Sequence, residues 1–220
     1  MITSGGIIGR AFQIYREQFV TLFAAALVIF LLELVAAWLL WILAGLVALI
    51  LGIFYQGMVV GLVRDVQDGR RDSSMGELFS AVAPVALPLL VVSILFGIGV
   101  GIGLILLIVP GLILLTIWAV VAPVTVIERP GIFAAFGRSR SLVRGHGWTV
   151  FGVIVLVFLI SVGVSLVAAL IGAPLGDTGR ALVQWIAGAL TAPIGALAAS
   201  VLYFALVDAA APAPAEVVVE

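Results

Sequence analysis

The residues of this sequence best suited to chemistry are three closely spaced arginines, Arg138, Arg140 and Arg144. An arginine side chain presents a planar fork of donors that can meet two phosphate oxygens at once. On a helix the three arginines lie toward one side. The other side is apolar and carries Ile132, Phe133, Phe136 and Val143. The pattern predicts an amphipathic helix among anionic lipid headgroups. The arginines either form a specific phosphate or headgroup site or only anchor a short loop by their positive charge.

One acidic residue, Glu33, stands inside a long apolar segment. An ionisable group within a membrane span is costly unless it is paired, protonated or hydrated, and it is a functional hypothesis by default. Because Arg180 is expected near the same depth, an ion pair between Glu33 and Arg180 would account for both residues. The alternative is a protonated or surface-reaching Glu33 that serves only packing.

No other residues are arranged for catalysis. The chain has no cysteine, and its single histidine, His146, stands in a polar turn without partners at metal-ligand spacing. No serine–histidine–aspartate set, carboxylate pair or phosphate-cradling loop can be assembled. The glycine-rich run at 97–103 is spaced for close helix packing in lipid, and it does not fit a dinucleotide-binding motif. We therefore expect no catalytic, metal-binding or cofactor-binding residue, and no enzyme.

The elements that must position these residues are dictated by composition. Hydrophobic residues make up 65% of the 220 residues and charged residues 10%, against roughly 45–50% and about 25% in soluble domains. A soluble domain of this size cannot bury so much apolar surface, so we predict an integral membrane protein. The net charge of −1 gives no reason to expect nucleic acid as a partner.

Three apolar segments are each long enough for two membrane crossings. Residues 19–63 would form one helix of roughly 65 Å, about twice the hydrocarbon thickness, so they must fold into two spans with a turn near Trp38 and Trp41. The segment 84–127 is divided at Val109-Pro110-Gly111, and the third segment is divided at 172–179.

The expected fold is therefore all-α, a polytopic transmembrane bundle of about six spans arranged as three hairpins. Short amphipathic stretches at 9–18, 75–82 and 132–144 precede the hairpins and are expected to be interfacial helices. We expect one transmembrane domain over 1–208 and a disordered tail at 209–220.

The arginines also predict the orientation. Nine of the ten basic residues, Arg10 and Arg16 among them, fall on one side of the predicted spans, and only Arg180 falls on the other. Short arginine-rich loops stay in the cytoplasm. Both termini are therefore expected on the cytoplasmic side of a bacterial inner membrane. Together with the three arginines at 138–144, Arg10 and Arg16 are candidates for binding lipid or a partner.

Several motifs together resemble a known family. They are Ile-Val-Pro-Gly at 108–111, Ala-Pro at 122–123 running to Glu128, Phe-Gly-Arg-Ser-Arg-Ser-Leu-Val-Arg-Gly at 136–145 followed by Trp148 and Phe151, and Leu-Tyr-Phe-Ala-Leu at 202–206. This order is similar to the membrane domain of some glycerophosphoryl diester phosphodiesterases, which also occurs alone in bacterial proteins. The resemblance covers nearly the whole chain up to Val207 and implies six helices. It implies no activity here, because the activity of the long members belongs to a soluble barrel that this chain is too short to contain. This sequence differs from the family in that its first external turn is very short.

These observations favour a non-enzymatic membrane protein that engages lipid headgroups, above all anionic ones, or a membrane partner, a second copy included. The alternative is a small transporter or permease subunit that uses Glu33 and helices broken at Pro110, Pro123 and Pro193. A membrane-embedded lipid enzyme is a third possibility. A continuous polar cavity reaching Glu33 would favour transport, whereas a dry, glycine-packed core with an exposed basic rim would favour lipid engagement.

Overall fold

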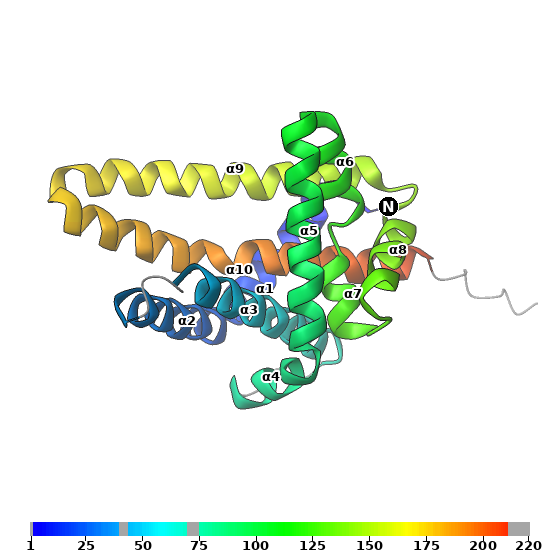
Figure 1. Ribbon diagram of the computed structural model, residues 1–220, viewed down its shortest axis with the longest axis horizontal. Helices are drawn as coiled ribbons and strands as arrows, with labels where there is room; N and C mark the ends of the chain where they lie inside the picture. Colours follow the sequence, from blue (N-terminus) through cyan, green and yellow to red (C-terminus); the bar gives the residue numbers. More distant parts are fainter. Residues whose placement is uncertain (1, 40–43, 70–74, 211–220) are drawn as a thin grey trace, which may run out of the picture.

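The computed structural model describes residues 2–39, 44–69 and 75–210, and within them all regular structure is helical (Figure 1). The elements are α1 (Ser4–Glu17), α2 (Phe19–Leu39), α3 (Ala44–Gln67), α4 (Met75–Val82), η1 (Ala83–Val85), α5 (Ala86–Leu106), α6 (Ile108–Ile117), α7 (Val121–Ile127), α8 (Ile132–Val143), α9 (Gly147–Gly172), η2 (Ala173–Leu175) and α10 (Gly176–Ala210). The all-α prediction is confirmed. The turn expected near Trp38 and Trp41 and most of the expected tail fall on residues outside the described ranges.

Four helical stretches of the described residues are long and apolar enough to cross a membrane: Val47–Gln67, Gly76–Leu106, Ile108–Ile127 and Gly147–Ala210. A fifth crossing is added if α1 and the first part of α2, which meet at 83°, count as one bent span. Their length and composition indicate a transmembrane protein. The count of about six spans in three hairpins stays a prediction.

The longest of these stretches, Gly147–Ala210, folds back on itself at η2, so that α9 and α10 lie side by side (Figure 1). A close approach at Gly172 makes this turn possible. A Cβ atom at that position would lie 2.9 Å from the Cα atom of Arg180. The loop predicted at 172–179 is therefore a tighter turn than expected, and α10 already begins at Gly176.

Helix α5 runs across the direction of α3, α9 and α10 (Figure 1). The molecule is therefore not a bundle of near-parallel helices. The chain leaves α5 at Leu107, which has an extended backbone, and then turns into α6. The turn is tight because two glycines touch: a Cβ atom on Gly103 would lie 2.8 Å from the Cα atom of Gly111.

The break predicted at Val109-Pro110-Gly111 lies at Leu107 instead, because a helix tolerates proline in its first turn. The first four backbone N–H groups of a helix have no partner within it, so a missing N–H there costs nothing. Pro110 occupies the first turn of α6, and Pro123 occupies the first turn of α7. Pro193, by contrast, lies inside α10, which continues through it.

The glycine run packs at only some of its positions. A Cβ atom on Gly99 would lie 2.7 Å from the indole ring of Trp118, and Gly103 meets Gly111 as described above. Gly97 and Gly101 have open space around them, so the expectation that Gly101 packs against a neighbouring helix is wrong. On α5 only the glycines at 99 and 103, which share one face, act as a packing surface.

Helices occupy all three stretches predicted to be amphipathic, as α1, α4 and α8. Helix α1 packs on α9 and α10, and α8 packs on α7, α5, α10 and α6. The best-buried side chains come from α1, α3, α7 and α10, for example Ile14, Val63, Val124 and Leu197. The two ends of the described chain lie close together, since Ile2 and Ala209 line the same groove.

Candidate functional site

Helix α8 is held on the body of the molecule by one apolar face and one buried hydroxyl. Its buried residues are Ala135, Ser139, Leu142 and Val143. The chain turns into α8 through Gly131, whose φ of 94° is one that residues with side chains rarely adopt. The hydroxyl of Ser139 donates a hydrogen bond of 3.0 Å to the carbonyl of Ile117, the last residue of α6. This bond satisfies a helix-end carbonyl and fixes α8 across the end of α6.

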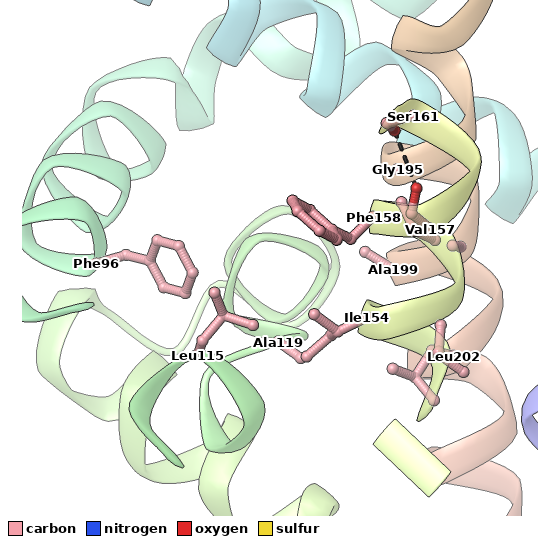
Figure 2. A pocket seen from close by; sticks show the side chains of 12 residues that line it. Phe96, Leu115, Ala119, Ile154, Val157, Phe158, Ser161, Gly195, Ala199 and Leu202 are labelled. Atoms are coloured by element: carbon pink, nitrogen blue, oxygen red, sulfur yellow. Dashed lines mark hydrogen bonds between the residues drawn. The ribbon is translucent and has the colours of Figure 1, made fainter. Parts of the chain in front are cut away.

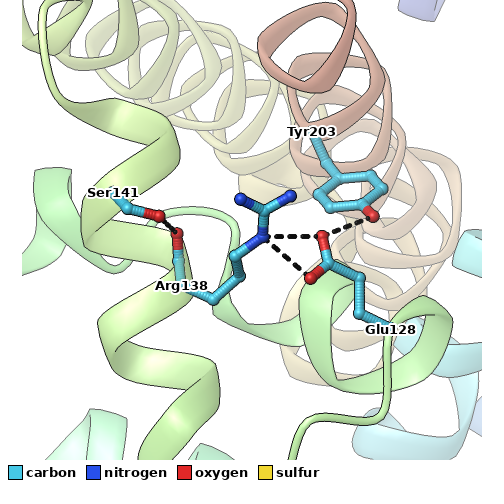
Figure 3. Close-up of polar contacts among 4 residues, drawn as sticks. All are labelled: Glu128, Arg138, Ser141 and Tyr203. Carbon is cyan, nitrogen blue, oxygen red and sulfur yellow. Dashed lines mark hydrogen bonds and ion pairs between the residues drawn. The ribbon is translucent and has the colours of Figure 1, made fainter. Parts of the chain in front are cut away.

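Arg138 is held by Glu128, the residue after α7, and Glu128 is held in turn by Tyr203 on α10 (Figure 3). The Nε atom of Arg138 donates to both carboxylate oxygens of Glu128, at 2.8 and 3.0 Å. The buried hydroxyl of Tyr203 on α10 donates to Oε1 of the same carboxylate, at 3.0 Å. The hydrogen bonds that Arg138 donates to Glu128 raise the pKa of Arg138, which secures its positive charge. Arg138 therefore connects α8 with the end of α7 and with α10, and its charge is already neutralised within the protein.

Arg140 and Arg144 have a different environment. Both are exposed and, together with Ser141, they line a groove of about 490 Å³ at the end of α8. Three glycines, Gly137, Gly145 and Gly147, form part of the same lining and leave backbone open to a ligand. Two guanidinium forks, a hydroxyl and accessible backbone are the groups that bind phosphate oxygens.

The predicted faces of α8 are therefore partly wrong. Arg138 turns away from the other two arginines. Phe133, expected on the buried side, is 82% exposed and shares the outward stripe with Gly137 and Arg140. Phe136 packs as predicted, with its ring edge-on to Trp118 at a centroid distance of 4.9 Å. Placing all three arginines on one side was too simple, because a carboxylate ten positions earlier is brought next to Arg138 by the turn between α7 and α8.

Arg10 and Arg16 lie exposed on α1, away from this groove. Arg10 donates to Gln13, which in turn donates to Glu17, both at 2.8 Å. These contacts run along the surface of one helix. The structure therefore does not gather the five candidate arginines into one site.

Glu33 and Arg180 are not brought together either. The two residues lie on α2 and α10, which contact each other, with the ring of Phe30 edge-on to that of Trp185. No ion pair joins Glu33 to Arg180 in the described part of the chain. Arg180 is exposed in the first turns of α10, beyond the turn that returns from α9.

An apolar cavity of about 380 Å³ opens between α5, α6, α9 and α10 (Figure 2). Its walls include Phe96, Leu115, Ile154, Phe158, Ala199 and Leu202. Among the described residues, the one polar side chain that lines the cavity is that of Ser161. Its hydroxyl donates to the carbonyl of Val157 at 2.9 Å and so offers no free donor. The cavity does not include Glu33 and carries no charged residue.

His146 lies between two of the glycines that line the arginine groove. The sequence suggests a solvated loop residue, but the Nδ1 atom of its ring is buried and has no hydrogen-bond partner among the described residues. Within those residues, no group of three or more histidines and carboxylates could hold a metal ion.

Sequence reasoning missed the roles of Glu128, Tyr203 and Ser141. A local signal existed for Glu128, an acid at the end of an apolar segment followed by a proline–glycine turn and a basic helix. None existed for Tyr203, which is 75 positions away from Glu128. Comparisons with protein families, with curated proteins and with solved structures find no match. The resemblance to the membrane domain of glycerophosphoryl diester phosphodiesterases stays a prediction.

Proposed function

We propose that this protein is a non-enzymatic membrane protein that binds the phosphate of anionic lipids in the groove of α8. The observation that supports this most strongly is the division among the arginines. Arg138 is neutralised by Glu128, whereas Arg140 and Arg144 line an open groove with a hydroxyl and three glycines. An unneutralised pair of guanidinium groups has a strong preference for phosphate.

Exposed aromatic residues beside the groove support a position at the headgroup level. Trp148 is 88% exposed at the start of α9, and Phe133 is 82% exposed on α8. Tryptophan and other aromatic side chains favour the interface between hydrocarbon and water. Past Trp148, α9 exposes a long run of apolar side chains, which suits contact with acyl chains. We place this end of the molecule at the cytoplasmic face of a bacterial inner membrane, with both termini on that side.

The transporter alternative has less support. The apolar cavity has no charged wall and does not reach Glu33, and α10 is not broken at Pro193. Transporters that use broken helices place freed backbone groups and ionisable side chains around a polar site. The interior cavity described above has the opposite character.

Liposome flotation tests the proposed function. Arg140→Lys and Arg144→Lys keep the charge but lose the fork, so each should weaken binding to phosphatidylglycerol by about tenfold at both low and high salt. Arg16→Lys on α1 is the matched control and should bind like the parent protein. If the lysine variants bind like the parent, and binding follows only net charge and ionic strength, the arginines are a topological anchor and the proposal is overturned.

A further inference from the structure

We propose that the arginine groove and the apolar cavity are two parts of one site that holds a single anionic phospholipid. The phosphate would lie in the groove against Arg140 and Arg144, and one acyl chain would lie in the cavity between α5, α6, α9 and α10. This inference rests on the proposed function, and it adds that the protein recognises the lipid tail as well as the headgroup.

Helix α9 connects the two parts along one face. Gly147 lines the groove, and Ile154, Phe158 and Ser161 line the cavity. These four positions follow the spacing of seven, four and three residues that keeps side chains on one side of an α-helix. A ligand that leaves the groove along this stripe therefore enters the cavity without passing around the helix.

The end of α6 borders both parts. Ile117 lines the groove, and Leu115 and Ala119, which face the other way, line the cavity. The bond from Ser139 to the carbonyl of Ile117 holds α8 at this point. The basic groove is thereby fixed over the end of α6, next to the apolar walls.

The depths of the two parts suit one leaflet of a bilayer. Val153, the first cavity residue on α9, is six residues beyond Gly147, or about 9 Å along the helix. Ser161 is eight residues further, or about 12 Å. The far end of the cavity therefore lies about 21 Å from Gly147. One leaflet with its headgroup region is about 20–22 Å thick. An acyl chain whose phosphate lies at Gly147 would therefore reach the far end of the cavity close to the bilayer midplane.

The cavity walls favour an acyl chain over a polar ligand. Gly195, Ala198 and Ala199 leave space along α10, Phe158 projects into this space from the neighbouring α9, and Phe96 on α5 lies on the opposite wall (Figure 2). Phe158 is 64% exposed, so the cavity is open at the outer surface of the helices. A volume of about 380 Å³ with apolar walls accommodates one narrow acyl chain.

A substitution at Gly195 tests the tail-binding part. A Cβ atom there would lie 3.9 Å from Val157, an ordinary contact, so a side chain can be accommodated without displacing α10. Gly195→Phe should fill the cavity with a ring. Gly195→Ala should leave most of the space. The matched control is Gly163→Phe on α9, where a new side chain meets nothing within 4 Å.

The measurement is native mass spectrometry of the purified full-length protein with dioleoyl-phosphatidylglycerol, its eight-carbon-chain analogue, dioleoyl-phosphatidylcholine and inorganic phosphate. All variants are first checked for an unchanged melting temperature.

We expect the parent protein to retain one long-chain phosphatidylglycerol in preference to the other three probes. Gly195→Phe should reduce this binding several-fold, to the level of the short-chain analogue, while Gly195→Ala and Gly163→Phe should not. Arg140→Gln should reduce binding of both the long-chain and the short-chain phosphatidylglycerol.

The outcomes separate the two proposals. If Arg140→Gln weakens binding but chain length and Gly195→Phe have no effect, the protein binds headgroups only and the two-part site is overturned, while the proposed function stands. If Arg140→Gln also has no effect, both are overturned. Displacement of the lipid by millimolar inorganic phosphate would make the groove a site for free phosphate and would overturn the lipid assignment.

Discussion

Arg138 and Arg140 stand two positions apart on α8 and meet different surroundings. Arg138 contacts the carboxylate of Glu128, which also accepts a hydrogen bond from Tyr203. Arg140 lines a groove open to its surroundings. Since successive residues on a helix point about 100° apart, two such positions face in nearly opposite directions. The same residue type therefore holds helices together at one position and is available for a ligand at the other.

A lysine at each position distinguishes these roles. Arg138→Lys keeps the charge but shortens the reach and changes the donor geometry, so it should lower the free energy of unfolding by about 1 kcal/mol, as expected for a half-exposed ion pair. Arg140→Lys should leave stability unchanged within about 0.5 kcal/mol. Chemical unfolding in detergent measures both. Equal stability losses in the two variants would contradict this division.

The contact between Tyr203 and Glu128 gives a second prediction at this scale. Tyr203→Phe removes a hydroxyl that donates to the part-buried carboxylate of Glu128, at a cost of about 1–2 kcal/mol. Combined with Glu128→Ala, which removes the acceptor, the loss should be smaller than the sum of the two single losses, because both changes remove the same bond. Thermal unfolding of the four proteins forms the cycle. Strict additivity would show that the two groups do not interact.

Glycines on α5 provide a matched series. Gly103→Ala places a Cβ atom against the backbone of Gly111, which cannot move aside, so we expect a loss of about 1–3 kcal/mol. Gly99→Ala presses on the ring of Trp118 and should also destabilise. Gly101→Ala meets open space and should be neutral or stabilising by up to about 1 kcal/mol. Melting temperatures in detergent decide. A Gly101→Ala variant as unstable as Gly103→Ala would contradict this packing.

Residue-level prediction from the sequence succeeded where the signal was local. The arginines of α8 were identified because their spacing and the neighbouring apolar residues belong to one helix. The contact between Tyr203 and Glu128 was out of reach, since it depends on how α10 passes the end of α7. For Glu33 and Arg180 the sequence offered only a shared expected depth, which does not determine whether two side chains meet, and no ion pair joins them among the described residues.

At the scale of elements, the turn between α5 and α6 has an unusual surface. Five consecutive apolar residues, 105–109, are between 65% and 86% exposed. A turn in contact with water normally carries polar residues. Since α5 and α6 share the cavity with the middle of α9, we expect this turn to lie at the depth of the acyl chains.

Cysteine labelling tests this depth directly, since the chain has no native cysteine. Leu107→Cys should resist a membrane-impermeant maleimide from either side of the membrane, because water does not reach the hydrocarbon core. Thr178→Cys, in the exposed first turn of α10, is the positive control and should label from one side. Rapid labelling of Leu107→Cys from the side that labels Thr178 would show instead that α5 crosses the bilayer, as the six-span prediction requires.

The sequence predicted the elements well and their ends less well. Apolar runs and prolines placed α2, α9 and α10 within a few residues of their observed bounds. The part of 84–127 that follows the expected break at Val109-Pro110-Gly111 was expected as one span but forms α6 and α7. The carbonyl at the end of α6, that of Ile117, accepts a hydrogen bond from buried Ser139, a partner that no pattern within 84–127 contains.

At the scale of the whole molecule, the ends of the described chain lie together beside α8, while the turn between α9 and α10 lies at the far end (Figure 1). Asp68→Cys and Ala209→Cys should therefore be labelled from the same side of the membrane, and Thr178→Cys from the opposite side. This holds whether α5, α6 and α7 cross the membrane twice or return to the side where they began, because the number of crossings is even in both cases. Labelling of Asp68→Cys and Ala209→Cys from opposite sides would contradict the topology.

The direction of α5 could not be foreseen from composition. Hydrophobic length shows that a helix is suited to lipid, but it does not fix how the helix is tilted against its neighbours. The direction follows from contacts such as Gly99 with Trp118, which form between segments that the sequence treats as separate.

The packing of α1 has a consequence for biosynthesis. Ser4 donates a hydrogen bond to the carbonyl of Thr149 on α9, and Tyr15 donates to that of Leu190 on α10. A ribosome makes α1 more than a hundred residues before these partners, so α1 must wait for them with much of its apolar face uncovered. A chain that stops before α10 would leave that face exposed to quality-control proteases.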